Sequence, residues 1–452
     1  RRDLLLSQRE PQFDVALDKQ IAEAADDFTR IALKAKAAKD YFLLVGPPGT
    51  GKTSCALKKM VETFYKEEGA QILLLSYTNR AVDEICKALS SIRPEVDFIR
   101  VGSELSCDEN YRDHLIENEL ATCMRRTEVC ERINRCRILV GTVASISGKP
   151  ELFRLKHFDV AIVDEATQIL EPQLLGILCA KGENGKEGVG KFILIGDHKQ
   201  LPAVVLQNTE QSEVYDEALS AVGLKNLKDS LFERLYRTAR QHTDAHRTYD
   251  MLCRQGRMHP EVALFANQAF YEGRLLPVGL PHQLEDSGNI NRLSFYPSRP
   301  EPMGSSAKTN HSEAKIAARL AATVYKEHSE AFDASRTLGI ITPYRSQIAL
   351  IKKEIEVLGI SELNQILIDT VERFQGSERD VIIYSFCVNY PYQLKFLSNL
   401  TEEDGILIDR KLNVALTRAR KQMLLTGVPT LLERNPLYKS LLKLIESLRN
   451  IA

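Results

Sequence analysis

The sequence contains the apolar run Tyr41-Phe42-Leu43-Leu44-Val45, followed at once by Gly46-Pro47-Pro48-Gly49-Thr50-Gly51-Lys52-Thr53. The five apolar residues predict a buried strand, and a helix-like segment, 54–65, follows the loop. The loop matches the pattern GxxxxGK[ST], which binds phosphate when it lies between a strand and a helix. Its glycines let backbone N–H groups face phosphate oxygens, and the helix N-terminus adds its dipole. The stretch therefore predicts a phosphate-binding loop.

Two side chains of this loop, and two carboxylates further along, are expected to act on a nucleotide. Lys52 would reach the β- and γ-phosphates, and the Thr53 hydroxyl would ligate Mg²⁺. The apolar run 160–163 leads directly into Asp164 and Glu165. We expect Asp164 to hold the metal, usually through water, and Glu165 to polarise the attacking water as general base. In the alternative interpretation, the two acids are a surface pair that caps the next helix.

A further apolar run, 192–195, leads into Gly196-Asp197-His198-Lys199-Gln200. The neutral amide of Gln200 can hydrogen-bond both the γ-phosphate and the lytic water, so we expect it to sense the phosphate. A glutamine after a strand is weak evidence by itself. His198 is interpreted as a loop side chain rather than as a ligand.

Short apolar runs alternate with charged, helix-like stretches in two series along the chain. This alternation predicts parallel sheets covered on both faces. A polar stretch separates the series, so we predict an α/β protein of two domains, residues 1–235 and 236–452, with a helical insertion at about 103–136. The runs lie at 41–45, 72–75, 137–140, 160–163 and 192–195, and then at 338–342, 365–368, 381–386 and 422–426.

The composition limits the kind of protein. The net charge of -1 means that any nucleic-acid site is a local groove rather than a general basic surface. The nine cysteines, an odd number without zinc-type spacing, predict a reducing compartment, cytoplasmic or, in a eukaryote, nuclear. No apolar run approaches membrane-spanning length, so we expect no membrane association. The chain begins Arg1-Arg2-Asp3, so we expect the monomeric core of a longer protein.

Three pieces in this order, GPPGTGKT at 46–53, DEAT at 164–167 and GDHKQLPAV at 196–204, resemble superfamily 1 helicases. The Gln-Leu-Pro ending is similar to the 5′-to-3′ branch, which includes the nonsense-mediated-decay helicase and DNA replication helicases. The resemblance runs from about residue 15 to 440, with further motif matches at 17–20, 76–83, 140–145, 257–260, 342–347, 369–378 and 413–420. It implies an AAA-type P-loop helicase core whose two tandem RecA-like domains hydrolyse ATP, with Mg²⁺, in the cleft between them.

The resemblance also implies roles for single residues. Gln20 would read the adenine edge and Glu378 would meet the ribose. Arg257 and Arg418 would act as arginine fingers, each worth about 10³–10⁵ in rate. The residues expected to contact a single strand, mostly through its phosphates, are Thr78, Asn79, Thr142, Tyr344 and Thr370.

One position departs from the family pattern. Gly256 stands where the family usually has an aromatic residue that stacks on the adenine. Such stacking is worth about 1–3 kcal/mol. We therefore expect a loose base preference, unless another ring substitutes.

These motifs predict an ATP-driven helicase or translocase that moves 5′ to 3′ along single-stranded DNA or RNA. An ATPase that displaces proteins without unwinding duplexes is the alternative, since the same motifs serve it. A scaffold with a dead ATPase site is disfavoured because Lys52, Asp164 and Glu165 are all present. DNA is slightly favoured over RNA, although the contacts to the 2′-hydroxyl that distinguish them are not encoded in a short motif.

Overall fold

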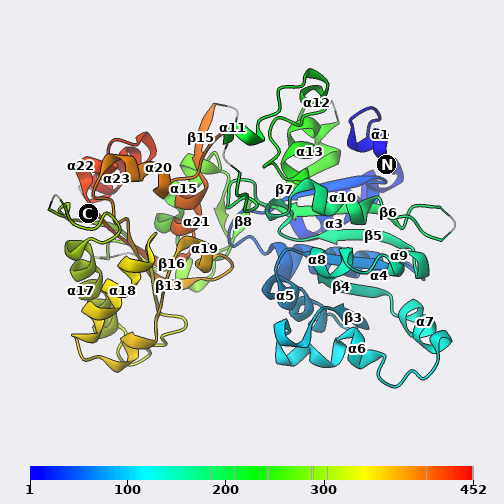
Figure 1. The fold of residues 1–452 in the computed structure, drawn as a ribbon, viewed down its shortest axis with the longest axis horizontal. Helices are drawn as coiled ribbons and strands as arrows, with labels where there is room; N and C mark the ends of the chain where they lie inside the picture. Colours follow the sequence, from blue (N-terminus) through cyan, green and yellow to red (C-terminus); the bar gives the residue numbers. More distant parts are fainter. Residues whose placement is uncertain are drawn as a thin grey trace. The chain divides into compact units, whose positions relative to one another are not determined.

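The computed structural model describes residues 1–183, 185–207, 209–241, 244–286, 288, 290–302, 304–403 and 405–449. The chain forms two compact units, which are described separately (Figure 1). The first consists of residues 1–47, 51–198 and 202–252, and the second of residues 48–50, 199–201 and 253–452. The main chain thus leaves the first unit after Leu252, downstream of the boundary expected at 235. The reason is strand β7 (Tyr249–Met251), which pairs with the edge of the first sheet.

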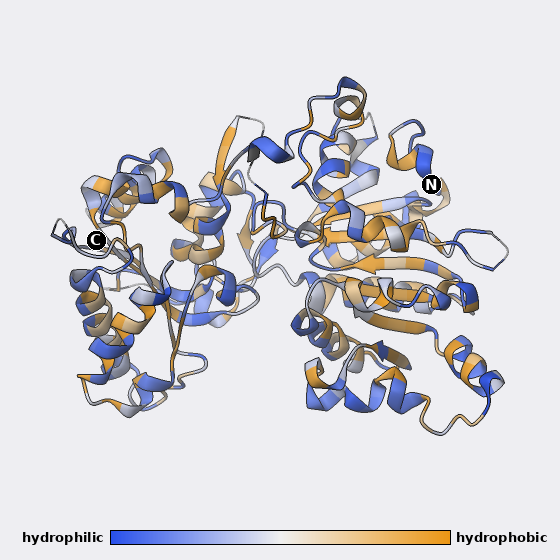
Figure 2. Cartoon of the chain, viewed as in Figure 1, coloured by the Kyte–Doolittle hydropathy of each residue, from blue (hydrophilic) through white to orange (hydrophobic). Residues whose placement is uncertain are grey.

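The first unit is built on a seven-stranded sheet in the order β3-β4-β2-β5-β6-β1-β7, and every pair is parallel. Successive residues of a strand lie in different core clusters, one on each face of the sheet: Leu43 belongs to one cluster and its neighbour Phe42 to the other. The inner strands are mostly apolar because both faces of the sheet are covered, and Figure 2 shows them largely in orange. Besides β7, the strands are β1 (Tyr41–Val45), β2 (Ile72–Ser76), β3 (Phe98–Val101), β4 (Ile138–Thr142), β5 (Phe158–Val163) and β6 (Val189–Gly196).

Helices cover this sheet, and polar caps start several of them. The Asp26 carboxylate, for example, accepts a hydrogen bond of 2.9 Å from the Thr29 N–H at the start of α3. The helices are α1 (Arg2–Leu5), α2 (Asp18–Ala22), α3 (Asp27–Ala37), α4 (Lys58–Tyr65), α5 (Asn79–Ser90), α6 (Ile116–Glu119), α7 (Arg126–Arg135), α8 (Val143–Ser147), α9 (Glu151–Leu155), α10 (Glu171–Leu178), α11 (Thr209–Ser212), α12 (Glu217–Ala221), α13 (Leu231–Ala239) and α14 (Ala245–Thr248).

The segment between β3 and β4 holds α6 and α7, in the place where a helical insertion is expected. Strand β3 itself was not predicted, because Arg100 interrupts its apolar run. The Arg100 side chain is buried, and its guanidinium contacts the Asp83 carboxylate and donates to the Ser106 carbonyl at 3.3 Å. A buried arginine is tolerated here because an opposite charge and a carbonyl pair with two of its nitrogens, Nη1 and Nη2.

The second unit is built on a five-stranded parallel sheet in the order β10-β16-β13-β11-β12. The predicted α/β class, with a parallel sheet in each of two units, is therefore confirmed. The strands are β10 (Leu293–Pro297), β11 (Leu338–Ile341), β12 (Leu367–Asp369), β13 (Arg379–Ser385) and β16 (Ala419–Gly427), besides the pairs β8 (Arg254–Gln255) with β9 (Leu276–Pro277) and β14 (Leu400–Glu403) with β15 (Ile406–Asp409).

The helices of the second unit include two long ones, α17 and α23, which are separated in sequence by most of the sheet. The complete set is α15 (Pro260–Phe270), α16 (Pro281–Leu284), α17 (His311–Glu327), α18 (Arg345–Glu356), α19 (Val371–Phe374), α20 (Leu394–Leu397), α21 (Arg410–Leu416), α22 (Pro429–Leu432) and α23 (Pro436–Arg449). Among the helices in the described ranges, none is long and apolar enough to cross a membrane.

A buried carboxylate, Glu313 of α17, lies in this unit. It accepts hydrogen bonds from the Ser385 hydroxyl at 2.7 Å, the Cys387 N–H at 2.8 Å and the Ser298 hydroxyl at 3.4 Å. Burial raises the pKa of Glu313 to about 7, although these hydrogen bonds oppose the rise. The charged form is therefore disfavoured in the folded protein.

The change Glu313→Gln should alter how stability depends on pH. The folded pKa of about 7 lies above the ordinary value of 4.5, so the associated stability is complete below about pH 4.5 and lost as pH rises through 7. Glutamine carries no charge to bury. The free energy of unfolding of the variant, relative to wild type, should therefore rise by about 1–3 kcal/mol when the pH is raised from 4.5 to 8. Urea unfolding at both pH values measures this gain, with the exposed Glu327→Gln on the same helix as control. An equal difference at both pH values contradicts the prediction.

Candidate active site

The phosphate loop joins β1 to the π-helical segment η2 (Lys52–Leu57), which continues into α4. The Gly46 N–H donates to the carbonyl of Gly196 at 2.9 Å, which ties the loop to the end of β6. A Cβ atom on Gly46 would lie 2.1 Å from Cγ of Lys52, so only glycine leaves room for this lysine side chain. Gly51 has a φ of 76°, in the left-handed region that favours glycine. The sequence thus forms the strand, loop and helix that phosphate binding requires.

Asp164 lies directly after β5 and is buried. Its carboxylate accepts hydrogen bonds from the Thr53 hydroxyl and, at 2.9 Å, from the Glu165 N–H. Burial raises the pKa of Asp164 to about 6, and the Glu165 charge adds to the rise, while Lys52 and Thr53 oppose it. A hydroxyl and a carboxylate side by side are oxygen donors of the kind that Mg²⁺ prefers. Thr53 and Asp164 therefore fit the metal predicted for them.

Glu165 has a left-handed backbone with a φ of 53°, which is uncommon for a residue other than glycine. One carboxylate oxygen, Oε1, lies 3.5 Å from Nζ of Lys52, and the other, Oε2, accepts a hydrogen bond of 3.0 Å from the Gln168 amide. The side chain makes no capping hydrogen bond to the helical turn that follows, η5 (Ala166–Gln168). The geometry of Glu165 therefore does not follow the helix-cap alternative.

Two of the expected nucleic-acid residues in this unit are helix caps. The Thr78 hydroxyl accepts from the Ala81 N–H at 3.2 Å, and the Thr142 hydroxyl accepts from the Ser145 N–H at 3.0 Å. Thr78 follows β2, and Thr142 is the last residue of the neighbouring parallel strand β4, so both lie at the carboxyl edge of the sheet. Asn79 begins α5 at the same edge. Gln20 is exposed on α2.

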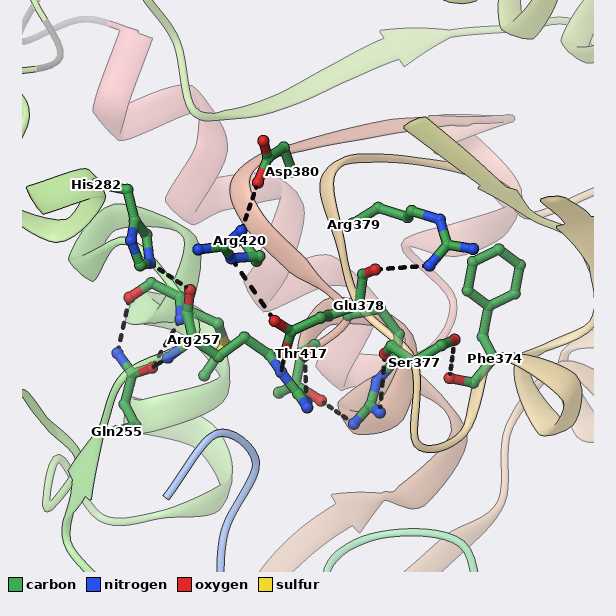
Figure 3. Close-up of polar contacts among 12 residues, drawn as sticks. Gln255, Arg257, His282, Phe374, Ser377, Glu378, Arg379, Asp380, Thr417 and Arg420 are labelled. Atoms are coloured by element: carbon green, nitrogen blue, oxygen red, sulfur yellow. Dashed lines mark hydrogen bonds and ion pairs between the residues drawn. The ribbon is translucent and has the colours of Figure 1, made fainter. Parts of the chain in front are cut away.

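In the second unit, Arg257 lies in the turn between β8 and α15 (Figure 3). The Gln255 side chain accepts from the Arg257 N–H at 3.0 Å, and His282 Nε2 is 2.9 Å from the Arg257 carbonyl. The guanidinium donates to Glu378 at 2.6 Å and to the Thr417 carbonyl at 3.2 Å. Both the main chain and the side chain of Arg257 are thus held in place.

Glu378 lies between two arginines. Besides the bond from Arg257, its other carboxylate oxygen is 3.7 Å from Nε of Arg420 (Figure 3). Burial opposes ionisation of Glu378, but the two arginines outweigh it and lower the pKa. Arg420 also donates to Asp380 at 3.1 Å. In this structure the Glu378 carboxylate binds guanidinium groups, which leaves its expected ribose contact a prediction.

Arg418 is buried in the second unit. Gln200 belongs to the same unit, which includes residues 199–201. The guanidinium donates to the Val414 carbonyl at 2.9 Å, to the Thr417 hydroxyl at 3.2 Å and to the Gln200 side-chain oxygen at 3.4 Å. Two residues that the sequence assigned to catalysis, Arg418 and Gln200, are thus in contact.

Comparison with known proteins supports the resemblance to helicases. Two family profiles, both described as AAA domain, match residues 23–129 with 116–208 and residues 227–430. The relatives include proteins named DNA replication ATP-dependent helicase/nuclease DNA2: that of Bos taurus is 28% identical over 99% of this chain, that of Xenopus laevis 31% over 87% and that of Homo sapiens 29% over 97%. The chain belongs to the superfamily 1 helicases.

This helicase chain spans 42%, 36% and 41% of the length of those three relatives. A solved complex of arterivirus nonstructural protein 10 (helicase) with DNA aligns over 88% of this chain and 62% of its own, at 15% identity. The TM-score of that alignment is 0.42, too low to establish a shared fold.

The helicase motif around Arg257 has a glycine where the family has a ring. The Gly256 N–H donates to the Gly49 carbonyl at 2.9 Å. A Cβ atom on Gly256 would lie 3.2 Å from Leu280 Cδ1 and 3.9 Å from Val278 Cγ2, and among the described residues no aromatic atom lies within 4 Å. Aliphatic side chains, not a substitute ring, therefore neighbour this position.

Sequence reasoning missed the residues that orient the helicase side chains. Gln168 orients Glu165, and Gln255 holds the turn at Arg257. The buried amide of Gln283 donates to the carbonyls of Gln255 and Met258, both at 2.9 Å. Only Gln168 carries a usable signal, because its spacing of three residues from Glu165 is that of one helical turn.

The cysteines of this helicase chain are all free thiols. Among the residues with described placement, no group of three or more His, Cys, Asp and Glu side chains is arranged to hold a metal ion.

Proposed function

We propose that this chain hydrolyses ATP to move 5′ to 3′ along single-stranded nucleic acid and to unwind the duplex ahead. One observation carries the proposal. Lys52 Nζ lies 3.5 Å from Glu165 Oε1, while the Thr53 hydroxyl bonds to Asp164. The first unit thus brings together three groups that hydrolysis of a phosphoanhydride requires. They are a cation for the phosphates, oxygen ligands for a metal and a candidate general base.

The residues of this site have distinct tasks in the proposal. Lys52 binds the β- and γ-phosphates, and Glu165, held by Gln168, accepts the proton of the attacking water. Thr53 and Asp164 hold Mg²⁺, which when bound neutralises charge on the phosphates. Gln20 reads the base. Backbone N–H groups of the loop residues 46–53 bind phosphate oxygens.

Arg257 and Arg418 stabilise the charge that develops on the transferred phosphoryl group, and Gln200 senses the γ-phosphate. Arg257 is paired with Glu378 in this structure, so a phosphate must compete with that carboxylate. Glu378 is then available for the ribose. Burial keeps the Arg418 guanidinium oriented by carbonyl and hydroxyl oxygens, which favours a fixed position over a flexible one.

The nucleic-acid strand binds at the carboxyl edges of the two sheets. Thr78, Asn79 and Thr142 supply contacts on the first unit, and Tyr344 and Thr370 on the second. The relatives are named for DNA replication, which supports DNA as the preferred strand. The 5′-to-3′ direction rests on the sequence Gln200-Leu201-Pro202 within the third motif.

Steady-state ATPase rates with and without matched single strands test the proposal. Single-stranded DNA should raise the rate about tenfold or more, within the usual range of coupling between two sites. Single-stranded RNA of the same sequence should raise it less, and removal of Mg²⁺ should abolish the rate in both cases. A rate that no strand changes contradicts coupling of hydrolysis to nucleic acid.

A further inference from the structure

We infer that Tyr392 and Phe396 form a stacking surface for the bases of single-stranded nucleic acid, an inference that rests on the proposed function. Both rings follow the end of β13, and they are unusually exposed: Tyr392 is 54% exposed and Phe396 is 65% exposed. Large rings left in water at one place mark an interaction surface. Every nucleobase has a flat face that can stack on such rings, so this kind of binding does not depend on the base sequence of the strand.

The two rings are arranged on one side of a short helical segment. Tyr392 lies in η7 (Pro391–Gln393), and Phe396 lies in α20, which follows without a break. A spacing of four residues places side chains on the same helical face. The Tyr392 ring is also stacked on Tyr390, with centroids 5.8 Å apart and planes within 12°. This support from Tyr390 holds one ring in a defined orientation before a base arrives.

A buried glutamine fixes this segment to the part of the sheet edge where a strand is expected. The Gln393 side-chain oxygen accepts from the Asn389 and Tyr390 N–H groups, both at 2.9 Å. Its amide donates to the Tyr344 hydroxyl at 3.2 Å and to the Ala307 carbonyl at 2.6 Å. Tyr344, already a candidate strand contact, is therefore tied directly to the segment that carries the two exposed rings.

The sheet topology brings these groups to one edge. Tyr344 follows β11, Thr370 follows β12 and the ring segment follows β13. The strand β11 pairs in parallel with both β12 and β13, so the carboxyl ends of all three meet. The exposed rings thus continue a row that starts with the expected contacts, which favours a nucleic-acid strand over an unrelated protein partner.

Lysines lie beside the rings. Lys395 is exposed between Tyr392 and Phe396 in sequence. The Lys411 ammonium donates to the Phe396 carbonyl at 3.3 Å and lies 3.4 Å from Glu372, which offsets part of its charge. Cations for the backbone phosphates together with rings for the bases are the combination that binds single strands without reading sequence.

A tryptophan introduced at the surface gives a direct test. The chain contains no tryptophan, so Tyr392→Trp places a single indole fluorophore in the full chain. Adding an oligo-dT single strand should quench its fluorescence, because a stacked base contacts the indole. The control is Tyr325→Trp in the last turn of α17, before β11 begins, and it should not respond. Equal responses of the two variants, or no quenching at position 392, overturn the inference.

The double change Tyr392→Ala with Phe396→Ala measures the contribution to affinity. Oligo-dT binding should weaken about tenfold or more, as expected for the loss of base stacking. Tyr215→Ala, which removes a ring that is 79% exposed in the first unit, should leave affinity unchanged. Thermal unfolding of each variant by circular dichroism establishes that it is folded.

Two outcomes separate this inference from the proposed function. Wild-type affinity in the folded double variant overturns the stacking surface and assigns the rings to another partner, while strand-stimulated hydrolysis by the wild type still stands. If no strand stimulates the wild-type ATPase, the proposed function fails first. A blunt-ended duplex of the same length distinguishes stacking from charge alone, since paired bases are unavailable to the rings and its binding should not change in the double variant.

Discussion

The change Glu165→Gln should lower ATP turnover at least about 10²-fold, the usual contribution of a general base, and should leave ATP binding intact. The amide has nearly the shape of the carboxylate and keeps a hydrogen bond to Gln168, but it cannot accept the proton of the attacking water. Lys52, now 3.5 Å from that carboxylate, loses a counter-charge and remains available for phosphate. Binding should therefore persist or become tighter while turnover collapses.

Two measurements on the same preparation separate binding from turnover. A fluorescent ATP analogue reports the dissociation constant, and phosphate release with single-stranded DNA present reports kcat. Glu151→Gln, an exposed glutamate at the start of α9, serves as the control and should behave as wild type. Unchanged turnover in Glu165→Gln would remove this residue from the proposed role.

The change Arg257→Ala should lower kcat about 10³-fold, the low end of the range for an arginine finger. The side chain is aligned by the Thr417 carbonyl and by Glu378, and its main chain is fixed by Gln255. Its removal therefore takes away a positioned cation without disturbing the turn. The loss should appear mainly in kcat, because the finger acts on charge that develops in the transition state.

A nearby arginine offers a matched control for this prediction. Arg254 is exposed on β8, three residues before Arg257, and Arg254→Ala should leave kcat near the wild-type value. Arg257→Lys should recover little activity, since an ammonium does not reproduce the planar fork of donors. If Arg257→Ala retains the wild-type kcat, or loses only ATP affinity, the finger assignment is wrong.

The strands that carry the motifs were predictable because they are buried on both faces and read as continuous apolar runs. The strands that escaped prediction break this rule. Strand β3 contains the buried Arg100, β7 is a short edge strand with a central Asp250, and β10 ends in Pro297. Because β7 was not recognised, the expected boundary at 235 falls before the point where the main chain leaves the first unit.

The phosphate loop and its carboxylates were predictable for a chemical reason. Phosphate and metal require a fixed order of residue types on consecutive positions, such as Lys52 with Thr53 or Asp164 with Glu165. The residues that hold these groups in place do not stand at fixed sequence positions relative to them. Gln283, for example, acts through a buried amide 25 residues after Met258, a relation that exists only once the chain has folded. Tyr392 and Phe396 lie outside every motif, and their exposure is visible only in three dimensions.

ATP-driven unwinding in the 5′-to-3′ direction can be measured by strand displacement on two matched DNA duplexes, one with a 5′ single-stranded overhang and one with a 3′ overhang. A parallel assay with streptavidin bound to the strand reports protein displacement without unwinding. We expect the 5′-overhang duplex to be unwound with ATP and Mg²⁺, Glu165→Gln to abolish this unwinding, and the 3′-overhang duplex to stay paired. Unwinding of the 3′-overhang duplex alone, or loss of streptavidin with neither duplex unwound, would contradict this expectation.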